Sequence, residues 1–202
     1  MIKRLQQLPT TAVSDATGGH TNVNHAIKPL DSAWHIAGRA VTVRLPDGEN
    51  GAVLEAIKGA AQGDILVIDA KGNTNRAVAG DFVASLAKGV GIAGFIVDGV
   101  IRDSQAMIAM GFPVFSRGTT VAAGVKNGGG QVNVPVAIGG VSVQPGDYIV
   151  ADADGVVVVP QETLDNIVQK AEDKLAKDEA RERQAHADGE ASIRAYLDKV
   201  VK

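Results

Sequence analysis

Six short runs of β-branched residues, each bounded by glycine, proline or aspartate, limit the folds open to this chain. Runs of this kind are typical of buried strands. Apolar residues with helical spacing at 52–62 and 76–90 separate the first three runs, and a further helix is expected after Arg102. Strands joined through helices pair in parallel, because the chain must cross over to re-enter the sheet at the same end. The runs lie at 40–45, 64–69, 94–98, 132–138, 148–152 and 155–160.

The second half of the chain has a different pattern. From Pro113 to Pro160, strands alternate with glycine turns, which predicts antiparallel strands. Glycine accounts for 24 of the 202 residues and aromatic residues for only 3%. That glycine content, about 12% against roughly 7% in average usage, disfavours a helical bundle. We therefore expect one α/β domain with two sheet layers.

The last forty or so residues are heavily charged but carry one apolar stripe. We divide the chain into an α/β domain at 1–160 and a charged helical C-terminal extension at 161–202. The extension is expected to pack either on its own domain or on a neighbouring subunit. The stripe consists of Leu164, Ile167, Val168, Ala171 and Leu175.

Composition excludes several classes of function. The chain has 20 basic and 23 acidic residues, a net charge of -3, which disfavours a nucleic-acid partner. It contains no cysteine, so disulfides and thiolate metal sites are excluded. The N-terminus lacks the apolar core of a signal peptide, and no apolar run approaches the ~20 residues of a membrane span. We expect a cytoplasmic protein.

A glycine motif at 89–94, GVGIAG, matches a dinucleotide fingerprint by letter. The fingerprint must follow a strand and open a helix, because the phosphate binds free amides at the helix start. Here the helical segment comes first and the strand follows. The motif therefore predicts a helix-to-strand turn.

An adjacent arginine and aspartate, Arg102 and Asp103, follow the buried run at 93–97. Strand ends of α/β sheets are where ligands bind. A guanidinium there suits a carboxylate substrate, and a carboxylate suits a hard divalent cation. The alternative is structural, with Asp103 capping a helix over 104–110 and Arg102 as its surface partner.

A second candidate element lies about twenty residues earlier, at Gly80 and Asp81. They stand at the start of a helical segment, where free backbone amides make a ready anion site. Each element belongs to one of two consecutive crossovers, so we expect them to converge.

These landmarks resemble the RraA-like family, which includes regulators of ribonuclease E activity and pyruvate aldolases. The similarity covers nearly the whole chain, with the glycines and the Arg-Asp pair in the same order. It is carried by GDILVIDA (63–70), AGDFVASLAKGVGIAGFIVDGVIRD (79–103), PVFSRGTT (113–120) and PVAIGGVSVQPGDYIVADADGVVVVP (135–160).

The resemblance implies a swivelling β/β/α domain, similar to phosphohistidine domains, with mixed sheets and a C-terminal helical tail. It also implies a homo-oligomer, a trimer or a dimer of trimers, with the active site between subunits. The aldolase branch acts on small 2-oxo acids with Mg²⁺ or Mn²⁺ as cofactor.

The family's site residues map onto this sequence. Asp103 would hold the metal and Arg102 would contact the pyruvyl group. Asp81 would hold water, and Asp15 would correspond to an N-terminal acid of the site. Glu179 or Glu182 would reach the site from the neighbouring subunit. The segment expected to bind the substrate carboxylate consists of Gly80, Asp81, Phe82 and Val83.

Two functions follow as expectations. The first is a metal-dependent aldolase that cleaves 4-hydroxy-4-methyl-2-oxoglutarate or 4-carboxy-4-hydroxy-2-oxoadipate, with oxaloacetate decarboxylase activity through the same pyruvate enolate. The alternative is a non-catalytic regulator that binds a ribonuclease. The long C-terminal segment and the intact Arg102–Asp103 pair favour the aldolase.

Overall fold

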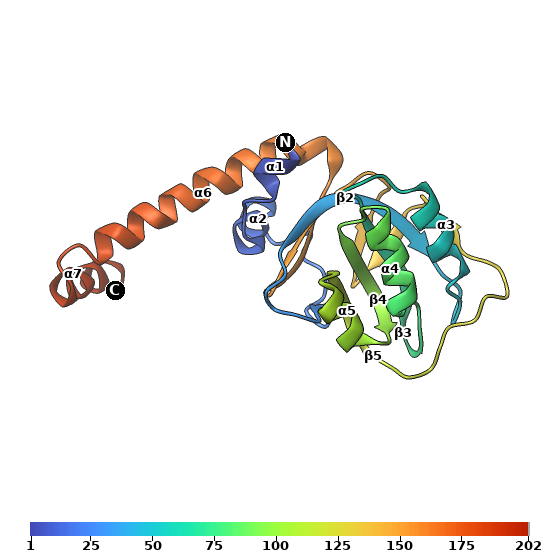
Figure 1. The fold of residues 1–202 in the computed structure, drawn as a ribbon. Coiled ribbons are helices and arrows are strands. Elements are labelled where there is room, and N and C mark those ends of the chain that lie inside the picture. Colours follow the sequence, from blue (N-terminus) through green and yellow to red (C-terminus); the bar gives the residue numbers. More distant parts are fainter. Residues whose placement is uncertain (202) are drawn as a thin grey trace.

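The computed structural model describes residues 1–201, which form an α/β fold around one large mixed sheet (Figure 1). The sheet has the strand order β1-β5-β4-β3-β2-β9-β10, with β6 paired to β2. Its strands are β1 (Lys28–Pro29), β2 (Ile36–Arg44), β3 (Ile65–Ala77), β4 (Gly94–Ile101), β5 (Val114–Thr119), β6 (Gln131–Val132), β9 (Tyr148–Asp152) and β10 (Gly155–Val159).

Strands β2, β3 and β4 pair in parallel, as the sequence predicts. The expectation of antiparallel strands from Pro113 onward is wrong for β5, which pairs in parallel with β4 because the helix Ser104–Met110 crosses over between them. Strands β1, β6, β9 and β10 pair antiparallel to their neighbours. A separate antiparallel hairpin is formed by β7 (Val136–Ile138) and β8 (Val141–Val143). The crossover helices are α3 (Gly51–Gly59), α4 (Asp81–Gly89) and α5 (Ser104–Met110).

Strand alternation divides the core into two layers. Leu66 and Ile68 of β3 face the layer that contains α3, α4 and α5. Ile65 and Val67 face the opposite layer, together with residues of the β7–β8 hairpin, β9 and β10. Because β4 is buried along its whole length, a ligand can reach this strand only at its ends.

Two boundaries differ from the sequence-based expectation. Residues 76–80 do not belong to a helix, because β3 continues to Ala77 and pairs with Val100 of β4. The expected strand at 132–138 is split into β6 and β7, with Asn133 at φ 55° between them. The motif at 89–94 is the predicted turn, since it joins the end of α4 to the start of β4.

The termini form a third layer. Helices α1 (Ile2–Leu5), α2 (Thr10–Thr17) and the first half of α6 (Leu164–Ala185) share a core with β2, β9 and β10. A short 3-10 helix, η1 (Gln161–Thr163), precedes α6, and α7 (Glu190–Val200) follows it. The buried residues of α6 end at Ala171, and beyond them the helix extends away from the sheet (Figure 1).

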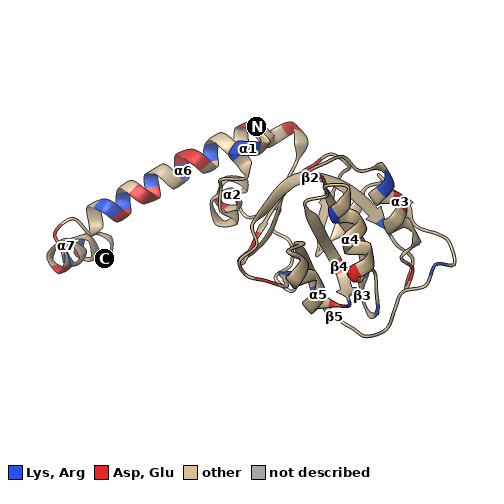
Figure 2. Cartoon of the chain, viewed as in Figure 1, with Lys and Arg blue, Asp and Glu red and all other residues tan. Residues whose placement is uncertain are grey.

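The projecting part of α6 carries alternating basic and acidic residues (Figure 2). Within residues 1–201, no helix is long and apolar enough to cross a membrane.

Candidate functional site

The backbone just after β4 is held from two sides. The Arg102 amide donates to the Ala79 carbonyl at 3.0 Å, and the Thr120 amide donates to the Ile101 carbonyl at 2.9 Å. The end of β4 is thereby fixed between the segment before α4 and the segment after β5. A site built on such a strand end has a defined geometry before any ligand binds.

Asp103 stands at the N-cap position of α5, yet its side chain makes no capping hydrogen bond. The residue has φ 58° and ψ 37°, a left-handed conformation that aspartate tolerates better than most residues. Its Oδ2 lies 3.2 Å from Arg102 Nε and 3.4 Å from the Asp81 amide nitrogen. The capping part of the structural alternative is therefore wrong, because the carboxylate is directed to the start of α4 and not to α5. Its other part, Arg102 as the partner of Asp103, agrees with the ion pair.

The start of α4 completes this cluster. Asp81 is its first residue, which places a negative charge near the positive end of the helix dipole. The Phe82 amide donates to Asp81 Oδ1 at 2.6 Å, so a ligand at this helix start must share or displace that contact. Val83 is buried, whereas the Phe82 side chain is 66% exposed.

Two cavities meet at Arg102 and Asp81. The smaller, of about 190 Å³, lies between α4 and the loop after β5. The larger, of about 490 Å³, opens toward Asp103 and α5. The structure thus brings Arg102, Asp103 and the Gly80–Val83 segment together, as the sequence predicts. Residues that sequence reasoning missed also line the smaller cavity: Asn50, Ala77, Ala79, Ala123, Gly124 and Lys126.

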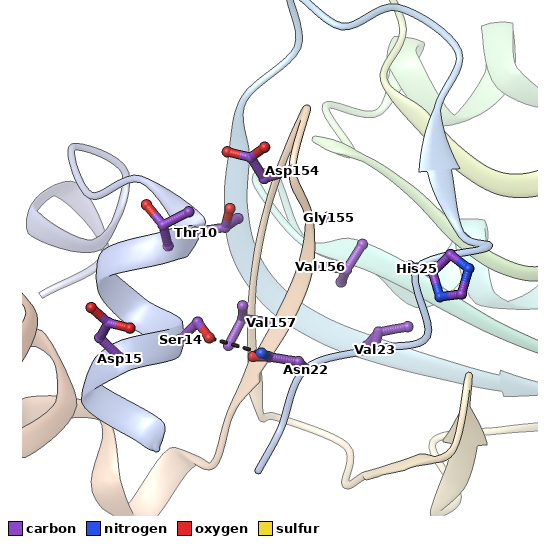
Figure 3. Close-up of a pocket in the computed structure, with 11 residues that line it drawn as sticks. Thr10, Ser14, Asp15, Asn22, Val23, His25, Asp154, Gly155, Val156 and Val157 are labelled. Carbon is purple, nitrogen blue, oxygen red and sulfur yellow. Dashed lines mark hydrogen bonds between the residues drawn. The ribbon is translucent and has the colours of Figure 1, made fainter. Parts of the chain in front are cut away.

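Asp15 lies elsewhere. It belongs to α2, and its carboxylate pairs with Lys174 of α6 at 3.3 Å. Figure 3 shows it at the edge of a different pocket, of about 330 Å³, between α2 and β10. Within one chain this geometry gives no support to a catalytic role for Asp15, because Asp15 lines neither of the two cavities at Arg102.

The two C-terminal glutamates are also outside the cluster. Glu179 pairs with Arg183 at 3.7 Å on the projecting part of α6, and Glu182 is exposed. The arm beyond Ala176 contacts little of its own chain apart from α7. The role of these glutamates at a neighbouring copy's site stays a prediction.

The donor set limits which metal this cluster suits. Among residues 1–201, no group of three or more histidine, cysteine, aspartate or glutamate side chains is positioned to hold a metal ion. One carboxylate, Asp103, with Asp81 beside it does fit Mg²⁺ or Mn²⁺, since Mg²⁺ commonly keeps several waters and takes one or two protein carboxylates. A zinc site, which needs three or four protein ligands, does not fit.

The chain is similar to known proteins in sequence and in fold. A Halalkalibacterium halodurans protein, provisionally named a 4-hydroxy-4-methyl-2-oxoglutarate aldolase, is 52% identical over 200 residues, covering 99% of this chain and 95% of the relative. A structure of Streptomyces coelicolor RraAS2, described as an unusual member of the RNase ES inhibitor RraA family, superposes with a TM-score of 0.80 at 30% identity, covering 90% and 96% of the two chains.

A second solved structure is that of the RNA-processing inhibitor RraA from Thermus thermophilis, with a TM-score of 0.70 at 29% identity over 76% of this chain and 93% of that one. The family model described as RraA-like, Aldolase/RraA, matches residues 10–158. The match spans the sheet, both crossovers around the Arg102–Asp103 cluster and the β9–β10 hairpin. The chain belongs to the RraA-like family.

Proposed function

We propose that this protein is a divalent-metal-dependent lyase that releases pyruvate from 4-hydroxy-4-methyl-2-oxoglutarate or 4-carboxy-4-hydroxy-2-oxoadipate, and from oxaloacetate. The observation that carries the proposal is the Asp103 carboxylate, which leaves its own helix uncapped and lies beside Arg102 at the start of α4. The name of the 52% identical relative supports the same activity.

The chemistry needs what this cluster offers. When the C3–C4 bond of the substrate breaks, its electron pair stays with the pyruvyl fragment as an enolate, so negative charge develops on the C2 oxygen. A divalent ion held by Asp103 would supply the electron-withdrawing charge that stabilises it. Arg102 would bind the pyruvyl group. The amides at the start of α4 would bind its carboxylate, which would share or displace the contacts that the Asp81 and Phe82 amides make with the Asp103 and Asp81 carboxylates.

Proton transfer falls to Asp81 in this proposal. In the aldol substrate, the C4 hydroxyl must lose a proton as its carbon becomes a carbonyl, and C3 of the enolate must gain one. The Asp81 carboxylate lines both cavities, so a water bound beside it would exchange these protons. Oxaloacetate requires only the second transfer, because its C4 leaves as carbon dioxide.

We further propose that the chain works as a homo-oligomer, a trimer or a dimer of trimers. Phe82 and Leu86 of α4 and Val90, which directly follows the helix, are spaced four residues apart and are 66%, 40% and 50% exposed. Large apolar side chains in one exposed row beside a site are a feature of interfaces. A second copy covering this row could bring Glu179 or Glu182 of its arm to Asp81.

The test is pyruvate release from 4-hydroxy-4-methyl-2-oxoglutarate and from oxaloacetate, each with and without Mg²⁺ or Mn²⁺. It is repeated with Asp103→Asn, because asparagine tolerates the left-handed conformation and removes only the charge. Metal-dependent release that is lost in the variant supports the lyase. Release that is unchanged in the variant would end the proposal.

The rival function is regulation of a ribonuclease, favoured by the descriptions of the two solved relatives. A regulator would inhibit a purified RNase E-type enzyme without metal-dependent turnover, and Asp103→Asn would still inhibit it. Pyruvate release and ribonuclease inhibition, each measured for the wild-type protein and for Asp103→Asn, therefore distinguish the two functions.

A further inference from the structure

The chain contains two Asn-Gly pairs, and they lie in opposite environments. One is Asn50-Gly51, at the start of α3, and the other is Asn127-Gly128, in the loop after β5. Asparagine is chemically labile, because the backbone nitrogen of the next residue can attack its side-chain amide carbon. A following glycine hinders that attack least, since it has no side chain. Whether either pair reacts depends on the local structure.

Asn50 is held in a conformation that opposes this reaction. Its φ and ψ are −143° and 7°; its amide donates to the Val125 carbonyl at 3.0 Å, and its carbonyl accepts from the Val53 amide at 3.3 Å. A Cβ built on Gly124 would lie 3.1 Å from Asn50 Cγ, so the carbon that would be attacked is packed against the backbone. Turning this carbon toward the Gly51 nitrogen would break the start of α3.

Asn127 is not restrained in this way. It is exposed, and its side chain makes no hydrogen bond within residues 1–201. In the same range the Gly128 amide donates no hydrogen bond, and nothing lies within 4 Å of a Cβ built on Gly128. Gly128, Gly129 and Gly130 have φ 95°, 113° and 97°, which glycine adopts without strain. Both reacting atoms therefore lie in an open segment whose backbone can turn.

We propose that Asn127 is a site of spontaneous deamidation, and that its conversion releases the loop after β5 from Glu49. The Gly128 nitrogen bonds to Asn127 Cγ, the proton of that nitrogen passes to the departing amide nitrogen, and ammonia leaves. Water then opens the resulting succinimide at either carbonyl, which gives aspartate or isoaspartate. The reaction needs no reagent other than water.

The product places a negative charge beside a buried carboxylate. Glu49 is 5% exposed, its Oε1 accepts from the Asn127 amide at 2.6 Å, and its Oε2 has no hydrogen-bond partner among the described residues. A carboxylate on residue 127 repels this group while the contact lasts. Lys126 is exposed, so solvent weakens its compensating attraction. Because Lys126 also lines the smaller cavity at Arg102, release of the loop would alter that cavity.

The first test follows ageing of the purified full-length protein in mildly alkaline buffer. Peptide mass spectrometry measures the acid formed at residues 50 and 127, with fragmentation that distinguishes aspartate from isoaspartate. We expect residue 127 to convert at least about 10-fold faster than residue 50, because only its backbone allows the attacking geometry. In urea-unfolded protein the two rates should converge. Asn127→Gln should resist conversion, since the longer side chain would have to close a larger ring.

The second test measures the consequence for the loop. Asn127→Asp carries the charge of the product, and Asn127→Gln is its neutral control. We expect Asn127→Asp to have a Tm about 2 to 4 °C below that of Asn127→Gln. In a Glu49→Gln background this difference should disappear, because the repulsion needs both carboxylates.

Equal conversion at residues 50 and 127 in the folded protein, or no conversion at residue 127, would overturn the modification site. A Tm difference that is absent, or that persists in the Glu49→Gln background, would overturn the link to Glu49. Neither test measures turnover, so both outcomes are independent of the proposed lyase function.

Discussion

The Asp103 carboxylate lies against the α-carbon of Gly80, so closely that a Cβ at Gly80 would be 2.6 Å from Oδ2 and 3.0 Å from Arg102 Nε. The glycine has φ −132°, which any residue adopts, so its absent side chain is needed for space and not for backbone freedom. We expect Gly80→Ala to move the Arg102 and Asp103 side chains and to lower pyruvate release by about 100-fold.

The control for this change is Gly89→Ala at the other end of α4. Nothing lies within 4 Å of a Cβ built at Gly89. Circular dichroism and thermal melting should show both variants folded, because the groups displaced at Gly80 are ends of flexible side chains. Full activity in Gly80→Ala would show that the close packing of the Asp103 and Arg102 side chains against Gly80 does not affect the rate of pyruvate release.

Arg102→Lys tests the geometry of the guanidinium. Lysine keeps the positive charge but loses the planar pair of donors that matches a carboxylate. We expect kcat/KM for pyruvate release to fall by about 10- to 100-fold while Mg²⁺ affinity, measured by calorimetry, stays near the wild-type value. A lysine variant with wild-type kinetics would show that Arg102 acts only through its charge.

Much of this arrangement could be predicted from the sequence, because local patterns report buried strands well. Three of the parallel strands, β2, β3 and β4, contain runs of buried valine and isoleucine, and the Arg102–Asp103 pair directly follows β4. The exact role of Asp103 could not be predicted. A residue before a helix is a natural cap, and only the conformation of Asp103 shows that its side chain makes no capping hydrogen bond.

Where sequence reasoning failed, distant contacts had overridden local preference. Residues 76–80 have helical spacing, but pairing of Ala77 with Val100 keeps the chain extended. The contribution of Lys126 to the smaller cavity could not be predicted, because its loop is held by distant positions: the Asn127 amide donates to Glu49, 78 residues earlier in the chain. The three glycines at 128–130 predict a loop, but they do not indicate which part of the fold that loop packs against.

Stability at low pH should depend on Asp152. Burial of its carboxyl acts to raise the pKa, but hydrogen bonds from the Thr10 hydroxyl and amide and from the Asp154 amide outweigh this, and the net pKa is lowered. These bonds cap α2 from β9. A lowered folded pKa stabilises the protein above the unfolded value, about 3.9, and this contribution is lost as pH falls through the folded pKa.

We therefore expect Asp152→Asn to lower the free energy of unfolding by about 1 to 2 kcal/mol at pH 7. The difference from wild type should shrink as pH falls below about 4, because the unfolded carboxyl takes up a proton there, and it should be lost below the lowered folded pKa. Urea unfolding at several pH values measures both. Asp154→Asn is the matched control, since that exposed side chain makes no hydrogen bond within residues 1–201. A difference that is the same at pH 3 and pH 7 would contradict the charge argument.

The C-terminal arm gives a test of assembly that does not depend on a measured oligomer size. If Glu179 or Glu182 acts at a neighbouring copy's site, a Glu179→Gln, Glu182→Gln double variant and an Asp103→Asn variant should each be inactive alone. Co-expressed, they should regain pyruvate release, because some sites then combine an intact Asp103 from one copy with an intact glutamate from another. Both glutamates lie on the exposed part of α6, so their substitution should leave the core folded. Full activity of the double variant alone would exclude the arm from the site, and the exposed row on α4 would then need another explanation.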